Sequence, residues 1–205
     1  YRRWWFWVVA TPIILFVALV IYRIPAVREK ERTEAVVAQI HSQKLTINDV
    51  NGEHLPPPPD PAQVDATIEG VDANGNGIRD DVELAIFKKY PNSARIRAAE
   101  LQYAMALQMY LSKVFNSETL VAVIQGENRA SLCIGDTTPN VSLSDSSERI
   151  KEVLAMSNAR QKEVEKLVFN TDIRQKTYKD TFQYMTSYGE GQSAVCDLDL
   201  TKLSN

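Results

Sequence analysis

Residues 72–83 read Asp-Ala-Asn-Gly-Asn-Gly-Ile-Arg-Asp-Asp-Val-Glu, with oxygen-bearing side chains at the first, third, fifth, ninth and twelfth places. A calcium ion takes about six to eight oxygen ligands, and a short loop surrounds it when alternate residues point inward and a glycine makes a sharp turn midway. Gly77 stands at that sixth place. The spacing therefore predicts a calcium-binding loop.

The expected ligands follow from the same spacing. They are the side-chain oxygens of Asp72, Asn74 and Asn76, the backbone carbonyl of Ile78, Asp80 directly or through a water molecule, and both carboxylate oxygens of Glu83. Only three of these groups are carboxylates, which indicates modest affinity, nearer that of extracellular modules than that of cytosolic buffers. Because Asn, Gly and Asp also build ordinary turns, an empty turn before a helix is the alternative.

These residues match the EF-hand loop formula and resemble the EF-hand-like and thrombospondin-type-3-like calcium loops of exported proteins. The eighth place differs, because Arg79 stands where paired sensor loops carry an apolar residue that makes a small β-bridge to the partner loop. The chain contains no second loop of this kind. The resemblance covers these twelve residues alone and implies one isolated calcium loop rather than a paired, opening sensor.

An apolar segment near the start of the chain predicts a membrane anchor. Trp4–Tyr22 comprises nineteen residues without a charge. At about 1.5 Å per residue such a helix reaches roughly 28 Å, close to the hydrocarbon thickness of a bilayer. Tryptophans at one end and Tyr22 with Arg23 at the other are typical of the two membrane interfaces. We therefore expect an anchor over residues 1–25 that contacts the lipid bilayer through residues 4–22.

The side of the membrane that the rest of the chain occupies is predicted from conflicting features. A cleaved signal peptide is the alternative to an anchor, but no small-residue cleavage site follows Tyr22. Four basic residues after the span outnumber two before it, which favours a cytoplasmic domain. Calcium ligation and a candidate disulfide between Cys133 and Cys196 favour export. Large domains also translocate largely regardless of the charges next to the span. We predict a single-pass membrane protein whose C-terminal domain is periplasmic or otherwise extracytoplasmic.

Residues 26–59 are expected to link the anchor to the domain. The segment 26–40 alternates in charge, continues the helical pattern and predicts a stalk. Residues 45–47 suggest a short strand, and Asn51-Gly52 a turn. The four prolines at 56–59 predict a stiff spacer of about 3 Å per residue, with a proline-rich docking ligand as the alternative.

Residues 60–205 are predicted to form an all-α bundle that contains the calcium loop. Asp60-Pro61 is typical of a helix start. Apolar periodicity indicates helices over residues 81–90, 93–115, 117–132 and 144–168, and a further one capped at 170–172. The helix over 93–115 is apolar on two faces, which favours a central position. Its methionine and tyrosine stripe leaves a partner groove as the alternative.

Two cysteines are the remaining candidates for covalent chemistry. In an exported domain, Cys133 and Cys196 are expected to form a disulfide that ties the C-terminal tail to the bundle, with two buried thiols as the alternative. The only histidines, His41 and His54, lie in the linker, so the domain has no histidine to activate a Ser or Cys nucleophile.

The composition excludes several other functions. The net charge is -3 with acidic and basic residues interspersed, so no nucleic-acid surface is expected. No zinc spacing, nucleophile elbow or phosphate-binding glycine loop occurs, and no small-molecule substrate is evident. We therefore predict a non-enzymatic accessory or structural subunit, anchored by one span, whose calcium-stabilised domain binds or spaces other membrane or envelope proteins. The alternatives are a calcium-responsive adaptor and an envelope enzyme that uses carboxylates.

Overall fold

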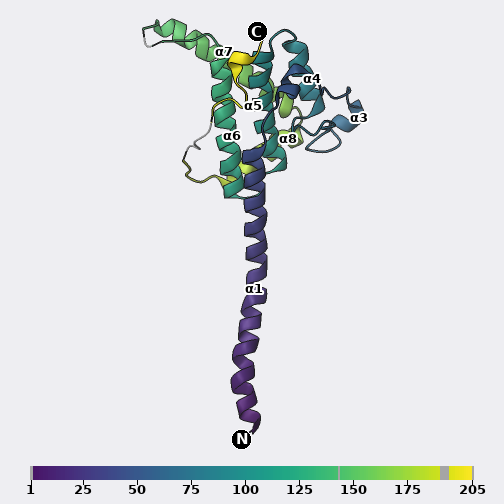
Figure 1. The fold of residues 1–205 in the computed structure, drawn as a ribbon, viewed down its shortest axis with the longest axis vertical. Coiled ribbons are helices and arrows are strands. Elements are labelled where there is room, and N and C mark those ends of the chain that lie inside the picture. The colour runs from purple at the N-terminus through teal and green to yellow at the C-terminus, as the bar shows by residue number, and fades with distance from the viewer. Residues whose placement is uncertain (1, 143, 190–193, 205) are drawn as a thin grey trace.

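The chain forms one long helix that projects from a bundle of shorter helices (Figure 1). The computed structural model describes residues 2–142, 144–189 and 194–204, and over these ranges it contains helices and loops but no strand. The helices are α1 (Arg2–Ser42), α2 (Ile47–Asn51), α3 (Pro61–Val64), α4 (Asp80–Lys89), α5 (Ala94–Ser112), α6 (Ser117–Asp136), α7 (Ser147–Val168) and α8 (Asp172–Thr181), followed by short 3-10 turns at Phe182–Tyr184 and Leu200–Lys202. The predicted all-α fold class is confirmed.

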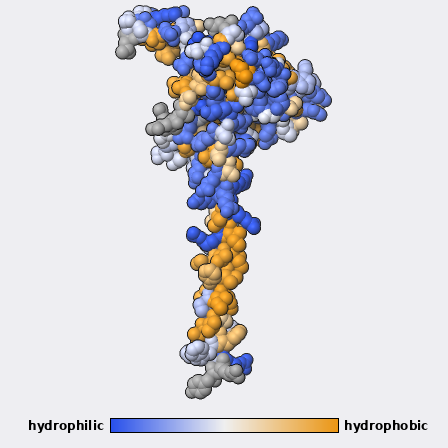
Figure 2. Space-filling model, viewed as in Figure 1, coloured by the Kyte–Doolittle hydropathy of each residue, from blue (hydrophilic) through white to orange (hydrophobic). Residues whose placement is uncertain are grey.

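The first half of α1 is an exposed apolar rod. Its most hydrophobic eighteen-residue window has a mean hydropathy of 2.3 and is 0% buried. Figure 2 shows this apolar band along the lower part of the helix, with hydrophilic residues between it and the bundle. Length and composition of this kind are shared by membrane spans and by signal sequences near an N-terminus. Pro12 and Pro25 both lie inside the helix, which runs on without a break.

The last turns of α1 are part of the bundle. Ile40 belongs to the hydrophobic core, and Val36 and Val37 pack against it. The Asn116 side chain donates a hydrogen bond of 2.7 Å to the hydroxyl of Thr33, which fixes the same turns to the start of α6. The expected helical continuation over residues 26–40 is therefore confirmed, and part of it is buried rather than exposed as a stalk.

The segment after α1 also packs into the core and contains no strand. Leu45 and Val50 are buried in the same hydrophobic cluster as the later helices. Thr46 stands at the N-cap of α2, where the side chain of Asp49 accepts hydrogen bonds of 2.7 Å from its backbone N–H and from its hydroxyl. The strand expected at residues 45–47 is wrong because a local cap satisfies the backbone here without a partner strand. Gly52 ends α2 in the left-handed region, so the turn at Asn51-Gly52 is confirmed.

Helix α5 is the centre of the bundle. It contacts α2, α4, α6, α7 and α8, and nearly all its residues from position 97 to 111 are buried. Alanines at several of these positions let neighbouring helices approach closely, while Leu101, Tyr103 and Leu107 fill the space between them. Met105 and Met109 are buried as well, so the stripe is core rather than a partner groove.

Buried arginines hold helix ends together around α5. A helix leaves its last carbonyl groups without intrahelical partners, and a guanidinium can donate to several of them at once. Arg97 donates to the carbonyls of Val50, Tyr90 and Pro91. Arg174, which is 0% exposed, donates to the carbonyls of Val64, Thr67 and Ile68 and to Asp65. The short segments before and after the candidate loop are therefore fixed by arginines on α5 and α8.

A disulfide between Cys133 and Cys196 fastens the C-terminal tail to α6, with an S–S distance of 2.04 Å. The tail is also held by Gln102, whose amide donates to the carbonyl of Val195 at 2.9 Å. Asp197 pairs with Arg129 at 2.6 Å and accepts the backbone N–H of Leu45 at 3.2 Å. The predicted disulfide is confirmed. The C-terminal tail that it fastens also contacts the segment that follows α1, through Asp197 and Leu45.

Replacing both cysteines by serine is predicted to lower the free energy of unfolding by roughly 4 kcal/mol, because the bridge closes a loop with a sequence separation of 63 residues. Urea denaturation of the full chain in detergent measures this difference. Reductant should destabilise the wild type by a similar amount and leave the double variant unchanged. Equal stability of the oxidised wild type and the variant would contradict the bridge's structural role.

Candidate metal centre

The predicted calcium loop is a surface turn between α3 and α4 that depends on glycine at its sixth place. Gly75 and Gly77 have φ angles of 72° and 85°, in the left-handed region that other residues adopt only with strain. A Cβ atom at Gly77 would also lie 1.7 Å from the amide nitrogen of Gln43. Gly77 is therefore required by the turn, and a larger residue there would also displace the side chain of Gln43.

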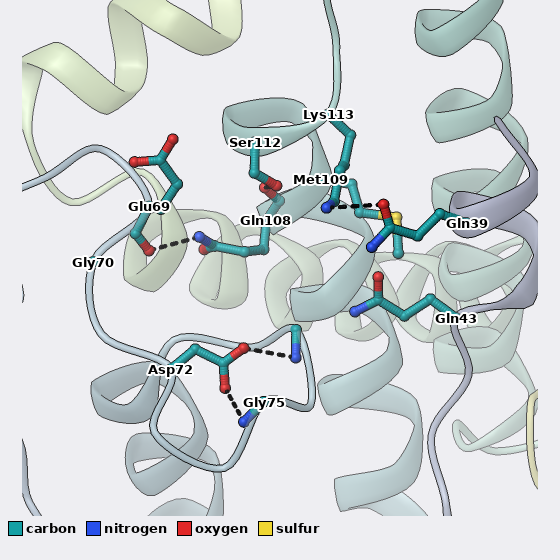
Figure 3. A pocket seen from close by; sticks show the side chains of 11 residues that line it. Gln39, Gln43, Glu69, Gly70, Asp72, Gly75, Gln108, Met109, Ser112 and Lys113 are labelled. Atoms are coloured by element: carbon teal, nitrogen blue, oxygen red, sulfur yellow. Dashed lines mark hydrogen bonds between the residues drawn. The ribbon is translucent and has the colours of Figure 1, made fainter. Parts of the chain in front are cut away.

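Side chains at alternate places curl the first half of the loop. Asp72 accepts the backbone N–H groups of Gly75 and Gly77, both at 2.9 Å, through its two carboxylate oxygens (Figure 3). Asn76 accepts the backbone N–H of Ile78 at 2.9 Å. Short polar side chains that hold nearby backbone N–H groups are the usual means of stabilising a tight turn.

The second half of the loop closes back on the first. Asp80 accepts the backbone N–H of Ala73 at 2.9 Å, and the amide nitrogen of Asn74 donates to Glu83 at 3.0 Å. The side chain of Ile78 is 1% exposed and fixes the loop to the hydrophobic core. Hydrogen bonds therefore join Asn74 at the third place to Glu83 at the twelfth. They also join Ala73 at the second place to Asp80 at the ninth.

Glu83 is a buried carboxylate with incomplete hydrogen bonding. The residue is 0% exposed, its Oε2 accepts from Asn74, and its Oε1 has no hydrogen-bond partner. Burial raises the pKa of Glu83 to about 7, and the negative charges of Asp49 and Asp80 contribute in the same direction. Burial likewise raises the pKa of Asp80. An unpartnered buried carboxylate oxygen costs at least about 1–3 kcal/mol, which a cation bound next to it would offset.

The candidate ligands are not gathered into a carboxylate cluster. Within residues 2–142, 144–189 and 194–204, no three His, Cys, Asp or Glu side chains lie together in a group that could hold a metal ion. Asp72 instead uses both oxygens on backbone N–H groups, while Asp80 and Glu83 contact other parts of the loop. The loop's possible metal ligands are amide, carbonyl and separated carboxylate oxygens, and oxygen ligands suit a hard cation such as Ca²⁺.

Arg79, at the eighth place, has a structural role that sequence reasoning did not find. Its side chain is 1% exposed, donates to the carbonyls of Leu167 and Val168 at 2.7 and 3.1 Å, and pairs with Asp81. These carbonyls end α7, so the guanidinium fixes the loop to that helix. The signal was present in the sequence as a charged residue at a place that is usually apolar.

Gly70 makes room for this arginine. Its φ angle is 73°, and a Cβ atom there would lie 2.2 Å from Cδ of Arg79. The entry to the loop and the buried guanidinium thus depend on each other.

Comparison with protein-family models, curated proteins and solved structures gives no match to this chain. The assignment of a function therefore depends on the chain's own residues.

Changing Arg79 to Met is predicted to lower the free energy of unfolding by about 3 kcal/mol, because it leaves the carbonyls of Leu167 and Val168 at the end of α7 without their donors and breaks the pair with the partly exposed Asp81. Thermal and urea denaturation in chelator measure the effect. The matched control is Arg149→Met, which breaks an exposed pair with Glu152 and should cost under about 1 kcal/mol. Similar losses for the two variants would contradict the role given to Arg79.

The stability of the calcium-free chain is predicted to fall as the pH rises. The folded chain holds the Glu83 proton more tightly than the unfolded chain, because its pKa is about 7 rather than the ordinary 4.5. The stabilisation is complete below about pH 4.5 and is lost as the pH rises through 7. Glu83→Gln should reduce this slope in urea denaturation with chelator, whereas Glu148→Gln on the exposed start of α7 should not. An unchanged slope in Glu83→Gln would exclude this carboxyl as a source of the pH dependence.

Proposed function

We propose that this chain is a single-pass, membrane-anchored accessory subunit that holds a calcium-stabilised helical domain at a fixed height above the bilayer, where it binds or spaces other membrane or envelope proteins. The observation that carries the proposal is the continuity of α1. One helix extends from the exposed apolar segment to Ile40 in the core of the bundle. A spacer needs a stiff connection of this kind between membrane and domain.

In this proposal Trp4–Tyr22 is the span rather than a cleaved signal. No small-residue cleavage site follows Tyr22, and α1 continues as one helix from the apolar segment to Ser42. The Cys133–Cys196 disulfide supports an extracytoplasmic domain, since such bonds persist in oxidising compartments. The basic residues that follow the span favour a cytoplasmic domain, but large domains translocate largely regardless of these charges.

The loop is proposed to bind Ca²⁺. Asp72, Asn74, Asn76, the carbonyl of Ile78, Asp80 and Glu83 are the residues that would hold it, and the unpartnered Oε1 of Glu83 supports a cation at this place. The ion would supply positive charge to a buried carboxylate and join the two halves of the loop. Since Arg79 attaches the same loop to α7, stabilising the loop stabilises the bundle.

A surface for a protein partner is available on α7. The first turns of this helix extend beyond the neighbouring helices (Figure 1). They expose the apolar side chains of Leu154 and Met156, at 55% and 44%. Two positions apart, these side chains point to opposite sides of the helix, so a partner that contacts both would have to enclose the projecting turns.

The calcium proposal predicts a conditional loss of stability. Asp72→Ala should lower the melting temperature of the full chain in chelator, because the loop loses the hydrogen bonds from Gly75 and Gly77, and should lower it further in excess calcium, because the loop then also loses a ligand. Differential scanning calorimetry with and without calcium measures both conditions. The control is Asp60→Ala, which removes the cap of α3 outside the loop and should have the same effect in both conditions. A loss for Asp72→Ala that is equal with and without calcium would contradict metal ligation.

The partner proposal is tested by crosslinking in native membranes. The wild type should yield a reproducible crosslinked membrane or envelope protein after purification in mild detergent. Leu154→Glu together with Met156→Glu should reduce that yield at least about tenfold while the melting temperature stays unchanged, since both side chains are exposed. Retention of the full yield in the double variant would exclude these two side chains of α7 as the contact.

A further inference from the structure

Two glutamates from neighbouring helices meet the same face of α5. Tyr103 and Tyr110 are seven positions apart on this helix, so their side chains lie on one face of it, and each is 2% exposed. The hydroxyl of Tyr103 donates to Oε1 of Glu165 on α7 at 3.0 Å. The hydroxyl of Tyr110 donates to Glu127 on α6. Since α6 and α7 also contact each other, both carboxylates lie at the junction of three helices.

Neither glutamate is paired with a positive charge. No ion pair in the described part of the chain includes Glu127 or Glu165. Arg129, two positions further along α6, pairs with Asp197 instead. Each carboxylate therefore accepts from a tyrosine hydroxyl, which offsets a negative charge less than a neighbouring cation does.

Helix α8 packs against the same junction. The ring of Tyr178 lies edge-on to the ring of Tyr110, with centroids 5.0 Å apart, and stacks on Phe169, which follows α7, at 4.4 Å. Burial raises the pKa of Tyr178 to about 12, and the negative charges of Glu127 and Glu165 contribute. Helices α7 and α8 are therefore attached to α5 and α6 through one group of side chains around the two carboxylates.

Glu127 holds its proton more tightly than an exposed glutamate does. Burial raises its pKa, the negative charge of Glu165 acts in the same direction, and hydrogen bonds from Tyr110 and Tyr103 lower it. The groups that act on Glu127 thus come from α5 and α7, and none of them is basic in the part of the chain that the structure describes. Burial also raises the pKa values of Tyr103 and Tyr110, so both hydroxyls keep their protons and continue to donate.

We propose that Glu127 is a proton switch at this junction: neutral Glu127 lets α7 and α8 pack closely on α5 and α6, whereas ionised Glu127 repels Glu165 and loosens that packing. The step is the binding of one proton from solvent to one carboxylate, with no other bond made or broken. Calcium binding by the loop is not required, because neither glutamate belongs to the loop. The projecting turns at Leu154 and Met156 belong to α7, so the proton also affects how firmly that surface is held.

The packing at this junction is expected to be tightest in acid. The pKa of Glu127 in the folded chain lies above its ordinary 4.5, so the stabilisation by the proton is complete below about pH 4.5. This stabilisation is lost as the pH rises through the folded pKa. Two like charges that face each other in a partly buried site then oppose the contact between α6 and α7.

The test compares Glu127→Gln with the wild type, using the full chain in lipid nanodiscs. Glutamine keeps an oxygen that can accept from Tyr110 and removes the titrating proton. The matched control is Glu118→Gln, which removes an exposed charge from the first turn of the same helix. A second variant, Glu165→Gln, removes the facing charge and leaves Glu127 in place. Infrared spectroscopy follows the protonated carboxyl groups, and hydrogen exchange, corrected for the intrinsic pH dependence of amide exchange, follows residues 160–181.

In the wild type and in Glu118→Gln, exchange in residues 160–181 should become about tenfold faster between about pH 5 and pH 8. Glu127→Gln should abolish this dependence and should lose a carboxyl group that protonates above the ordinary range, which Glu118→Gln retains. Glu165→Gln should weaken the dependence, because the repulsion is gone. Equal pH dependence of exchange, or equal infrared titration above about pH 4.5, in Glu127→Gln and Glu118→Gln would overturn the inference. If Glu127→Gln does not fold, an unchanged pH dependence in Glu165→Gln overturns it equally.

Discussion

The packing of the end of α1 into the core determines how the rest of the structure is arranged. Thr33, Ile40 and Leu45 belong to one continuous segment, and each contacts an element from later in the chain. Because a helix is stiff over this length, burying its last turns also fixes the direction of its apolar half. The loop lies beside the same turns, as the contact between Gln43 and Asn76 shows. The apolar segment, the bundle and the candidate site are thereby connected through a few turns of one helix.

Around the loop, buried guanidinium groups donate hydrogen bonds to backbone carbonyl groups that a longer helix would satisfy internally. The segments next to the loop are short, so many of their carbonyl groups have no helical partner. Arg97 of α5 and Arg174 of α8 donate to such carbonyls, and Arg79, just before α4, donates to carbonyls that end α7. Each supplies several N–H groups in a fixed plane, which an apolar side chain of similar volume cannot do. Glu83 is the reverse case, a buried carboxylate with an unpartnered oxygen.

Much of the fold follows from patterns within single segments. The helix starts at Asp60, Ser93 and Thr171 were predictable because capping needs only the next few residues, and each of these side chains accepts a backbone N–H as expected. The apolar face of α5 likewise indicated its central position. The cysteine pair was predictable because only two cysteines occur.

Features that depend on residues far apart in the chain were not predictable. The proline run suggested a separation between stalk and domain, yet Leu45 and Val50, which precede it, are buried in the common core. Arg79 could be recognised as unusual, but its partners at the end of α7 lie 88 and 89 positions further along the chain. The strand expected at residues 45–47 is absent because Asp49 caps α2 locally. The loop was found from its spacing, whereas the contact of Gln43 with Asn76 required the fold.

The central claim is that the apolar helix and the bundle form one rigid body. Spin labels on cysteines introduced at exposed Glu29 of α1 and exposed Lys166 of α7 test it by pulsed electron paramagnetic resonance in nanodiscs, since Cys133 and Cys196 are joined to each other and do not react with the label. The account predicts a single narrow distance distribution between the two labels. A broad or multimodal distribution would show that α1 moves independently of the bundle and would contradict the account.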